Sequence, residues 1–366
     1  MKKSYDESNG DKYMSMTKKE LNTIKKQVDA IKEFLRKLPD EREDAVQPTR
    51  VQFTRLLSAP ASARKIPGIP VRMNEDGEYK CNDEEAETTK NFLNQMFHVY
   101  SKESLLDFQR VQFRSSVHYE QFMTFWKGAP LFNVNTLDEN VQEIFNESMQ
   151  KAETFYPIVQ ERGIYAWDIN EYIGLCRAAR ACGIITDNDY EEIVDHFVKK
   201  VQVFYHSFKE YAESLLFGAL YFMVEGNGPD GLDQFLEIQK TIVSNLFEDG
   251  APWSHYAWYR PEEREWAQVY PGNPGCIVSK LALSDGIGYM YRDTPMKDTP
   301  DSGWRFLHGD ESDEYIDNQE NIEVLDVNTI CNLRPDILAY LEAPVESAYG
   351  WDGKTWTLEP LDHPET

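Results

Sequence analysis

The last quarter of the chain, residues 275–351, alternates short strand-like runs with residues that favour turns. Apolar and β-branched runs separated by Asp, Gly, Pro and Asn are typical of short antiparallel strands joined by tight connections. The runs lie at 276–279, 287–292, 304–307 and 322–327. We therefore expect a small α+β domain with an antiparallel meander over residues 272–366.

The chain before this domain has a different pattern, because apolar side chains recur every three or four positions between residues 84 and 271. That spacing is typical of amphipathic helices. Helices are expected near 85–100, 102–126, 140–156, 167–183, 186–201 and 207–224. The last of these is apolar on most sides, as in the buried centre of a bundle. The predicted fold class is α+β, with a mainly helical N-terminal and central region followed by the smaller domain.

The clearest single helix is predicted at 17–38, within a basic amphipathic segment over residues 1–40. Thr17 and Glu20 have the spacing of a capping box, and a narrow apolar seam runs from Leu21 to Leu38. Lysines and arginines fill the other faces. Because so short a seam is marginal as a free coiled coil, we expect this helix to dock on the rest of the protein. Pairing with a second copy or with a partner is the alternative.

Residues 41–83 contain repeated Pro, Ala, Ser and Gly, which disfavour a long helix. This segment is predicted to be an extended connector that leads to the helical domain at 84–271. Its most apolar part, residues 51–57, either pairs as a strand or packs against a neighbouring domain.

The formal net charge of −25 limits the partners that the chain can attract. Nucleic acid and anionic membranes are repelled, whereas a basic protein is attracted. A surplus of carboxylates also keeps proteins soluble, so charge alone does not identify a partner. The sequence shows no secretory signal and no run of membrane-spanning length. Five cysteines without a close pair favour reduced thiols, so we expect a cytoplasmic protein.

No motif predicts catalysis, a cofactor or a metal. Gly226, Gly228 and Gly231 have the spacing of a dinucleotide-binding turn, but the preceding run is predicted to be helical and Pro229 interrupts the turn. The seven histidines do not combine with cysteines or carboxylates at a metal-ligand spacing. We therefore predict a non-catalytic protein without a cofactor or metal.

An acidic run at 310–326 is the leading candidate for a binding surface, because it contains eight Asp and Glu and no Lys or Arg. Such a cluster repels itself, so it stays solvated or meets a cation or a basic surface. The run lacks EF-hand spacing, which disfavours calcium, and a merely solvated edge is the alternative. Aromatic residues beside the carboxylates would anchor a protein partner. The predicted partner-binding residues are Trp304, Phe306, Asp310, Glu311, Asp313, Glu314, Tyr315 and Asp317.

A second candidate lies near or on the helix predicted at 167–183. An acid and two arginines there would suit a pocket for an anionic group of a small ligand or substrate. The competing interpretation is structural, with Asp168 as a helix cap and the arginines in an internal salt bridge. The site would belong to an uncharacterised enzyme or a small-ligand-binding protein, which is the alternative function. Its residues are Trp167, Asp168, Arg177 and Arg180.

The last quarter of the chain contains several distinctive short sequence motifs. They are Cys276-Ile-Val-Ser, Gly288-Tyr-Met-Tyr-Arg292, Asp301-Ser-Gly-Trp-Arg-Phe306, Gly309-Asp-Glu-Ser-Asp-Glu-Tyr315, Asp326-Val-Asn-Thr329 and Pro335-Asp336. These motifs resemble a bacterial domain family of unknown function that is also classed as immunity protein thirty-three of polymorphic toxin systems. The resemblance implies a cytosolic protein that binds and neutralises a toxin, here a basic toxin domain.

The helical region is similar to a second bacterial family, the YbeR/YbeU-like domain of unknown function. The similarity rests on Ala166-Trp-Asp168, Gly183-Ile-Ile-Thr186, Ser207-Phe-Lys-Glu-Tyr211, Gly218 and Pro252-Trp253. It implies no activity, and neither resemblance covers the basic N-terminal helix or the connector. We therefore predict a non-catalytic, cytosolic immunity-type protein that neutralises its partner through an acidic face.

Overall fold

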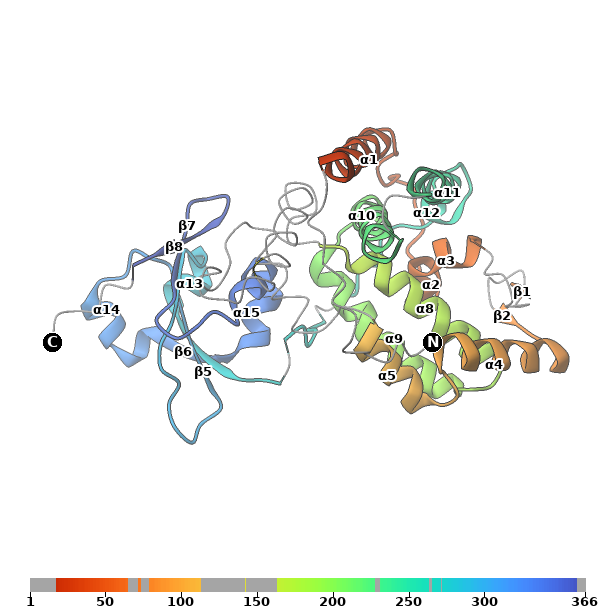
Figure 1. Cartoon of the computed structure of the whole chain (residues 1–366). Helices are drawn as coiled ribbons and strands as arrows, with labels where there is room; N and C mark the ends of the chain where they lie inside the picture. The colour runs from red at the N-terminus through yellow and green to blue at the C-terminus, as the bar shows by residue number, and fades with distance from the viewer. Residues whose placement is uncertain are drawn as a thin grey trace.

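The computed structural model describes residues 18–64, 72–73, 79–112, 142, 163–227, 231–262, 265–270 and 272–360. Figure 1 shows a helical module, built from the earlier part of the chain, and a sheet-containing module built from the last part. This arrangement confirms the predicted α+β class. The helix predicted at 140–156 lies outside the described residues except for residue 142, and so does the end of the helix predicted at 102–126.

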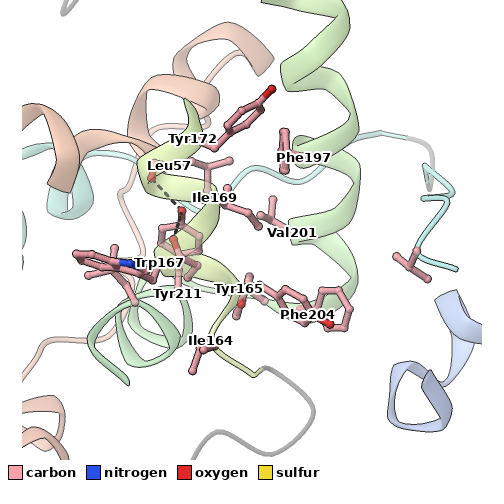
Figure 2. Close-up of a cluster of buried hydrophobic side chains, with 14 of the residues drawn as sticks. Leu57, Ile164, Tyr165, Trp167, Ile169, Tyr172, Phe197, Val201, Phe204 and Tyr211 are labelled. Atoms are coloured by element: carbon pink, nitrogen blue, oxygen red, sulfur yellow. Dashed lines mark hydrogen bonds between the residues drawn. The ribbon is translucent and has the colours of Figure 1, made fainter. Parts of the chain in front are cut away.

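The helical module is organised around two long helices, α8 and α10, that pack closely against each other. Its elements are α1 (Lys18–Arg36), α2 (Arg50–Leu57), α3 (Ala59–Ala63), β1 (Arg72–Met73), β2 (Tyr79–Lys80), α4 (Asp83–Phe97), α5 (Lys102–Gln112), α8 (Tyr165–Ala181), α9 (Asp187–Phe204), α10 (Phe208–Asn227), α11 (Leu232–Leu246) and α12 (Pro252–His255). A Cβ atom on Gly218 of α10 would lie 2.3 Å from the Cβ of Trp167 on α8, so only glycine permits this approach. The Tyr211 hydroxyl lies 2.9 Å from the Leu57 carbonyl oxygen and 3.1 Å from that of Ala166 (Figure 2). It therefore ties α10 to both α2 and α8.

Helix α1 packs against α10 and α11 through its apolar seam. Ile24, Val28 and Ile31 of this seam are buried. Gln27, on the same face, donates a hydrogen bond to the Asp233 carboxylate at the start of α11. The helix therefore docks on the helical module, as the sequence led us to expect.

The segment 41–83 is not extended throughout, and the possible strand at 51–57 is wrong. A capping box starts α2 there, because Thr49 Oγ1 accepts from Gln52 N (3.2 Å) and Gln52 Oε1 accepts from Thr49 N (2.8 Å). Phe53 and Leu57, on the inner face of α2, are fully buried. Burying an apolar face stabilises a helix too short to form alone. The alternative expectation was packing against a neighbouring domain, and α2 does pack against α8 and α9 of the predicted helical domain.

The sheet-containing module has one six-stranded sheet, in the order β6-β3-β5-β4-β7-β8. Its elements are β3 (Gly275–Ser279), α13 (Lys280–Asp285), β4 (Tyr289–Arg292), β5 (Asp301–Leu307), α14 (Asp313–Asp317), η3 (Gln319–Asn321), β6 (Ile322–Asp326), α15 (Val327–Leu333), η4 (Pro335–Tyr340), β7 (Ala348–Trp351) and β8 (Trp356–Glu359). The sheet is mostly antiparallel, as predicted, but it is not a simple meander, because β3 and β5 pair in parallel. In this strand order, β6 lies at one edge of the sheet and β8 lies at the other.

The chain between the modules is held against α15 by two asparagines one helical turn apart. Asn328 Oδ1 accepts hydrogen bonds from the backbone N–H groups of Val269 (2.9 Å) and Tyr270 (2.8 Å). Asn332 pairs with both backbone groups of Ala267, accepting at 3.0 Å and donating at 2.7 Å. The sheet-containing module therefore includes residues that precede the predicted boundary at 272.

Candidate binding surface

The acidic run of residues 310–326, here called the acidic edge, follows β5 and ends in the edge strand β6. Neither α14 nor η3 has a buried side chain, so side-chain caps rather than apolar packing shape this segment. Ser312 Oγ accepts from Tyr315 N (3.2 Å) at the start of α14. Asn318 Oδ1 accepts from Glu320 N (3.0 Å) at the start of η3. The caps give the acidic edge a defined backbone at the surface.

Glu311 differs from its acidic neighbours because its carboxylate binds inward. It accepts hydrogen bonds from the backbone N–H groups of His308 (2.8 Å) and Gly309 (2.8 Å) and from the Ser279 hydroxyl. Burial acts to raise the pKa of Glu311, but the hydrogen bonds from Ser279 and the backbone outweigh it and lower the pKa. Glu311 therefore fastens the start of the acidic edge to the end of β3.

The other carboxylates of the acidic edge face solvent. Lys280 Nζ lies 3.6 Å from the Glu323 carboxylate, and His308 Nδ1 lies 3.4 Å from that of Asp310. Such long, exposed contacts neutralise little charge, so the edge presents a concentrated negative potential to solvent. The exposed members are Asp310, Asp313, Glu314, Asp317, Glu320 and Asp326, and Glu323 is half-exposed.

Two of the three predicted aromatic anchors are not at the surface. Trp304 is 1% exposed and Phe306 is fully buried, with their rings stacked at 6.0 Å. The Trp304 indole N–H donates to the Leu341 carbonyl oxygen (3.0 Å). Two positions apart on β5, these residues point to the same face of the sheet, and that face is the core. This correction leaves Tyr315, which is half-buried, as the aromatic residue of the predicted set that a partner can touch.

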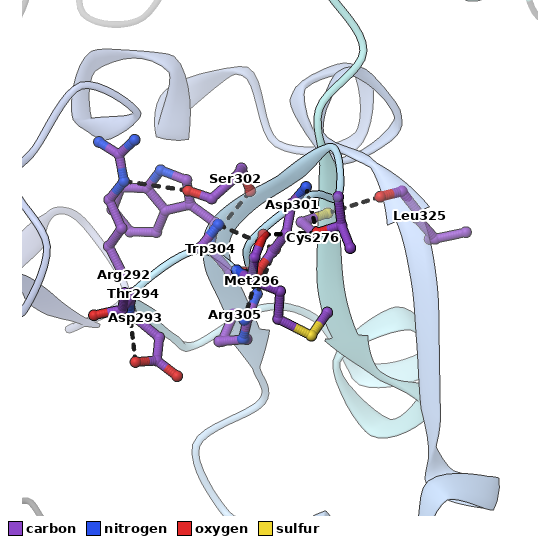
Figure 3. Close-up of polar contacts among 12 residues, drawn as sticks. Cys276, Arg292, Asp293, Thr294, Met296, Asp301, Ser302, Trp304, Arg305 and Leu325 are labelled. Atoms are coloured by element: carbon purple, nitrogen blue, oxygen red, sulfur yellow. Dashed lines mark hydrogen bonds and ion pairs between the residues drawn. The ribbon is translucent and has the colours of Figure 1, made fainter.

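An ion pair within β5 joins Asp301, at the start of this strand, to Arg305 (Figure 3). Both oxygens of Asp301 accept hydrogen bonds from the Arg305 guanidinium (2.9 and 3.0 Å), and Asp301 also accepts from Met296 N (2.9 Å). The hydrogen bonds from Arg305 lower the pKa of Asp301 well below its usual range. On the neighbouring strand, the Cys276 thiol donates to the Leu325 carbonyl oxygen (3.3 Å), and burial raises its pKa to about 12. Of these contacts, the bond from Cys276 reaches β6.

The second predicted site is not assembled into one pocket. Trp167 and Asp168 lie in the first turn of α8, whose N-cap is Ile164, so Asp168 is not the helix cap. Arg177 lies about 13 Å farther along the helix at 1.5 Å per residue. Arg180 packs its guanidinium 4.5 Å from the Tyr190 ring centroid, with Asp187 at 3.7 Å.

Arg177 instead fastens α8 to the segment before it. The side chain is 2% exposed, and Nη1 donates to the hydroxyls of Ser58 (2.8 Å) and Ser62 (2.9 Å). Its guanidinium carbon lies 4.2 Å from the Tyr79 ring centroid. A buried cation with these partners is part of the interior, which supports the structural interpretation.

The described residues contain no group of three or more His, Cys, Asp and Glu side chains that could hold a metal ion. No helix within those same ranges is both long enough and apolar enough to cross a bilayer.

Two family models match the chain, one for each module. Residues 27–258 match the model of a protein of unknown function (DUF1266), and this match covers well over half of the sequence. The chain belongs to the DUF1266 family. Residues 276–357 match the immunity protein Imm33 domain. No curated protein and no solved structure matches the chain.

These matches confirm the resemblance of the last quarter to immunity proteins and correct one expectation about the rest. The DUF1266 match begins at Gln27 inside α1 and includes residues 41–83, so this family covers about half of the basic helix and the whole connector. The YbeR/YbeU-like name for the helical region stays a prediction. The structure explains the longer match, because α1 and α2 complete the core around α10 and α8.

Three structural features of the sheet-containing module, from here on called the Imm33 module, were not predicted from the sequence. Val324 of β6 is 73% exposed, in the middle of an acidic edge strand. Asn328 and Asn332 hold the linker, and their spacing of four on a helix was the available signal. The hairpin of β7 and β8 was missed, although aromatic residues flank its Asp352-Gly353 turn.

Proposed function

We propose that this DUF1266 protein is an immunity-type protein that binds and neutralises a toxin through the acidic edge of its Imm33 module. The presence of an Imm33 domain supports an immunity role and a protein partner. The observation that supports the acidic edge is geometric, since its carboxylates lie on a capped, exposed segment with few cationic neighbours. The partner surface that fits this edge is basic.

The proposed mechanism is stoichiometric masking rather than turnover. Like charges gathered on one edge speed the encounter with a basic surface and fix its orientation. Tyr315 supplies apolar contact area beside Asp313 and Glu314, as aromatic residues do at interface centres. A toxin that binds an anionic substrate through a basic cleft would lose access to that substrate.

The competing proposal of an enzyme or small-ligand protein places its site at Asp168, Arg177 and Arg180. It has less support, because Arg177 is held by Ser58 and Ser62 inside the helical module. Arg180 points away from it, to Tyr190 and Asp187 on α9.

The test uses the full chain and a candidate toxin domain with a basic surface. We expect the chain to restore growth of cells that express the toxin, and purified toxin activity to reach zero near a one-to-one ratio. The double variant Asp313→Lys, Glu314→Lys is expected to associate at least tenfold more slowly at low salt. A matched control, Glu84→Lys with Glu87→Lys on α4, makes the same change in net charge far along the chain. Protection at a small fraction of the toxin concentration would instead indicate an enzyme, and equal rates for both variants would remove the acidic edge from the proposal.

A further inference from the structure

The edge strand β6 has backbone groups that point away from the sheet. Val327 N donates to Pro274 O (2.9 Å), which makes residues 274 and 327 a hydrogen-bonded antiparallel pair. Hydrogen-bonded and non-hydrogen-bonded pairs alternate along such a ladder. In the register Cys276↔Leu325 and Ile277↔Val324, Leu325 therefore faces β3 and Val324 faces outward.

A bond on the other side of β3 supports the same assignment. Gly275 N donates to Pro300 O (2.6 Å) just before β5, so Gly275 turns its backbone away from its partner Asp326. Asp326, like Val324, then directs its N–H group to the open side of β6. Ile322 shares this orientation, but its N–H already donates to the carbonyl oxygen of Gln319, the first residue of η3. The open groups are the N–H and C=O of Val324, the N–H of Asp326 and the C=O of Ile322.

Natural edge strands are usually blunted by lysine, proline or a bulge, because an open edge pairs with other chains. Strand β6 reads Ile-Glu-Val-Leu-Asp and pairs with β3 in continuous register, so it has none of these devices. The exposed Val324 adds an apolar contact at its centre. Negative charge is the remaining protection, and it selects among partners. A second copy would bring acidic side chains against acidic side chains, whereas a basic segment would be attracted.

From these observations we infer that β6 binds an extended, basic segment of the partner as an added strand of the sheet. The inference rests on the proposed function and specifies how the toxin is held. Val324 and Asp326 share one face of the strand, so the segment carries an apolar residue opposite Val324 and a Lys or Arg two positions away. Main-chain hydrogen bonds supply affinity, and the carboxylates of the acidic edge supply selectivity.

Strand β8, at the opposite edge of the sheet, is the weaker candidate for this role. Leu358 is exposed there, but Pro360 follows the strand directly and has no N–H group to donate. The carboxylates that would select a basic segment lie beside β6.

The decisive experiment compares Val324→Pro with Val324→Ala in the full chain, each bound to the toxin domain. Proline removes an N–H that β3 does not use, so the sheet is expected to survive while toxin affinity falls at least tenfold. Alanine keeps the N–H and is expected to retain most of the affinity. Binding of Val324→Pro as tight as that of the natural chain would overturn strand addition and leave the immunity function standing.

Hydrogen exchange of the natural chain gives a test that does not depend on the proline variant folding. The amides of Val324 and Asp326 are expected to become at least tenfold slower on toxin binding, while Leu325, already paired with β3, serves as the internal reference. Unchanged exchange in a formed complex would refute strand addition alone. Failure of the natural chain to bind the toxin would refute both proposals. If both amides were protected in the free chain, and this protection increased with the concentration of the chain, the edge would bind a second copy.

Discussion

A buried cation of the DUF1266 module and the exposed acidic edge of the Imm33 module show two different roles of charge. In the DUF1266 module, the buried Arg177 is enclosed by two serine hydroxyls and the face of Tyr79. In the Imm33 module, exposed carboxylates extend from Asp310 to Asp326, and Glu311 is the one that binds inward through the backbone of the preceding turn. A charged residue that the fold already satisfies holds the protein together, whereas charge left at the surface is available to another molecule.

The largest effect is expected from the interior of the Imm33 module. Trp304→Ala removes a ring that is 1% exposed and should lower the free energy of unfolding by about 3–5 kcal/mol. Urea unfolding followed by circular dichroism measures this loss. Trp266→Ala, at a site that is 49% exposed, is the matched control and should cost much less. Equal losses would mean that Trp304 is not a core residue, and its role as a partner anchor would return.

Removing the buried cation sharpens the contrast from the other module. Arg177→Ala breaks its contacts with Ser58 and Ser62 and should cost about 2–4 kcal/mol of folding stability. The partly exposed Arg180 is the control, and Arg180→Ala should cost about 1 kcal/mol or less. If Arg177→Ala left stability unchanged but abolished binding of a small anion, the interior assignment would be wrong.

Removing Asn328, which holds the chain between the two modules, should have an intermediate effect on folding stability. Asn328→Ala leaves the backbone N–H groups of Val269 and Tyr270 without their acceptor and should cost about 1–3 kcal/mol. Asn321→Ala, which removes a single hydrogen bond to Tyr315 O, is expected to cost about 1 kcal/mol or less. Thermal unfolding of both variants measures the difference, and a silent Asn328→Ala would show that the linker is not held by this side chain.

Acid should separate Glu311 from its neighbours. Because its pKa is lower in the folded chain than in the unfolded one, its carboxylate stabilises the fold above about pH 4.3, the usual value for an unfolded Glu. That contribution disappears as the pH falls through the folded-state pKa. Glu311→Gln should therefore flatten the decline in melting temperature between about pH 5 and pH 3, and the exposed Glu320→Gln should not. If the melting temperatures of the natural chain and of Glu311→Gln declined in parallel with pH, the stabilising role of the Glu311 carboxylate would be contradicted.

The smallest effect on folding is expected at the exposed carboxylates. Asp313→Lys with Glu314→Lys should change the unfolding free energy by about 0.5 kcal/mol or less, because both side chains are solvated. Calorimetry of this variant beside Trp304→Ala would show the two ends of the comparison in one module. A loss of several kcal/mol would mean that these charges are structural after all.

The sequence predicted the fold class and the helices α1, α4, α5, α8, α9 and α10, because the period of apolar residues is a local property, but it did not predict α11. It placed four strands correctly, yet it could not show that β3 pairs with β5 in parallel, since strand order depends on distant contacts. The helix α2 was not predicted, because repeated Pro, Ala, Ser and Gly disfavour a long helix, whereas the Thr49 and Gln52 capping box starts a short one. Trp304 and Phe306 were assigned to the surface by proximity to carboxylates, although their alternation with Arg305 indicated the core face. The open groups of Val324 were beyond sequence reasoning, because backbone direction follows from register.

The docked linker changes what counts as an exchangeable part of this protein. The Imm33 match starts at residue 276, but Ala267, Val269 and Tyr270 are bonded to α15 through Asn328 and Asn332. A gene fusion that joined a new domain at the first matched residue would leave the side chains of Asn328 and Asn332 without the backbone groups that they bind. Domain exchange that preserves function should therefore include the residues just before the match, because the structural unit is longer than the segment that the family model matches.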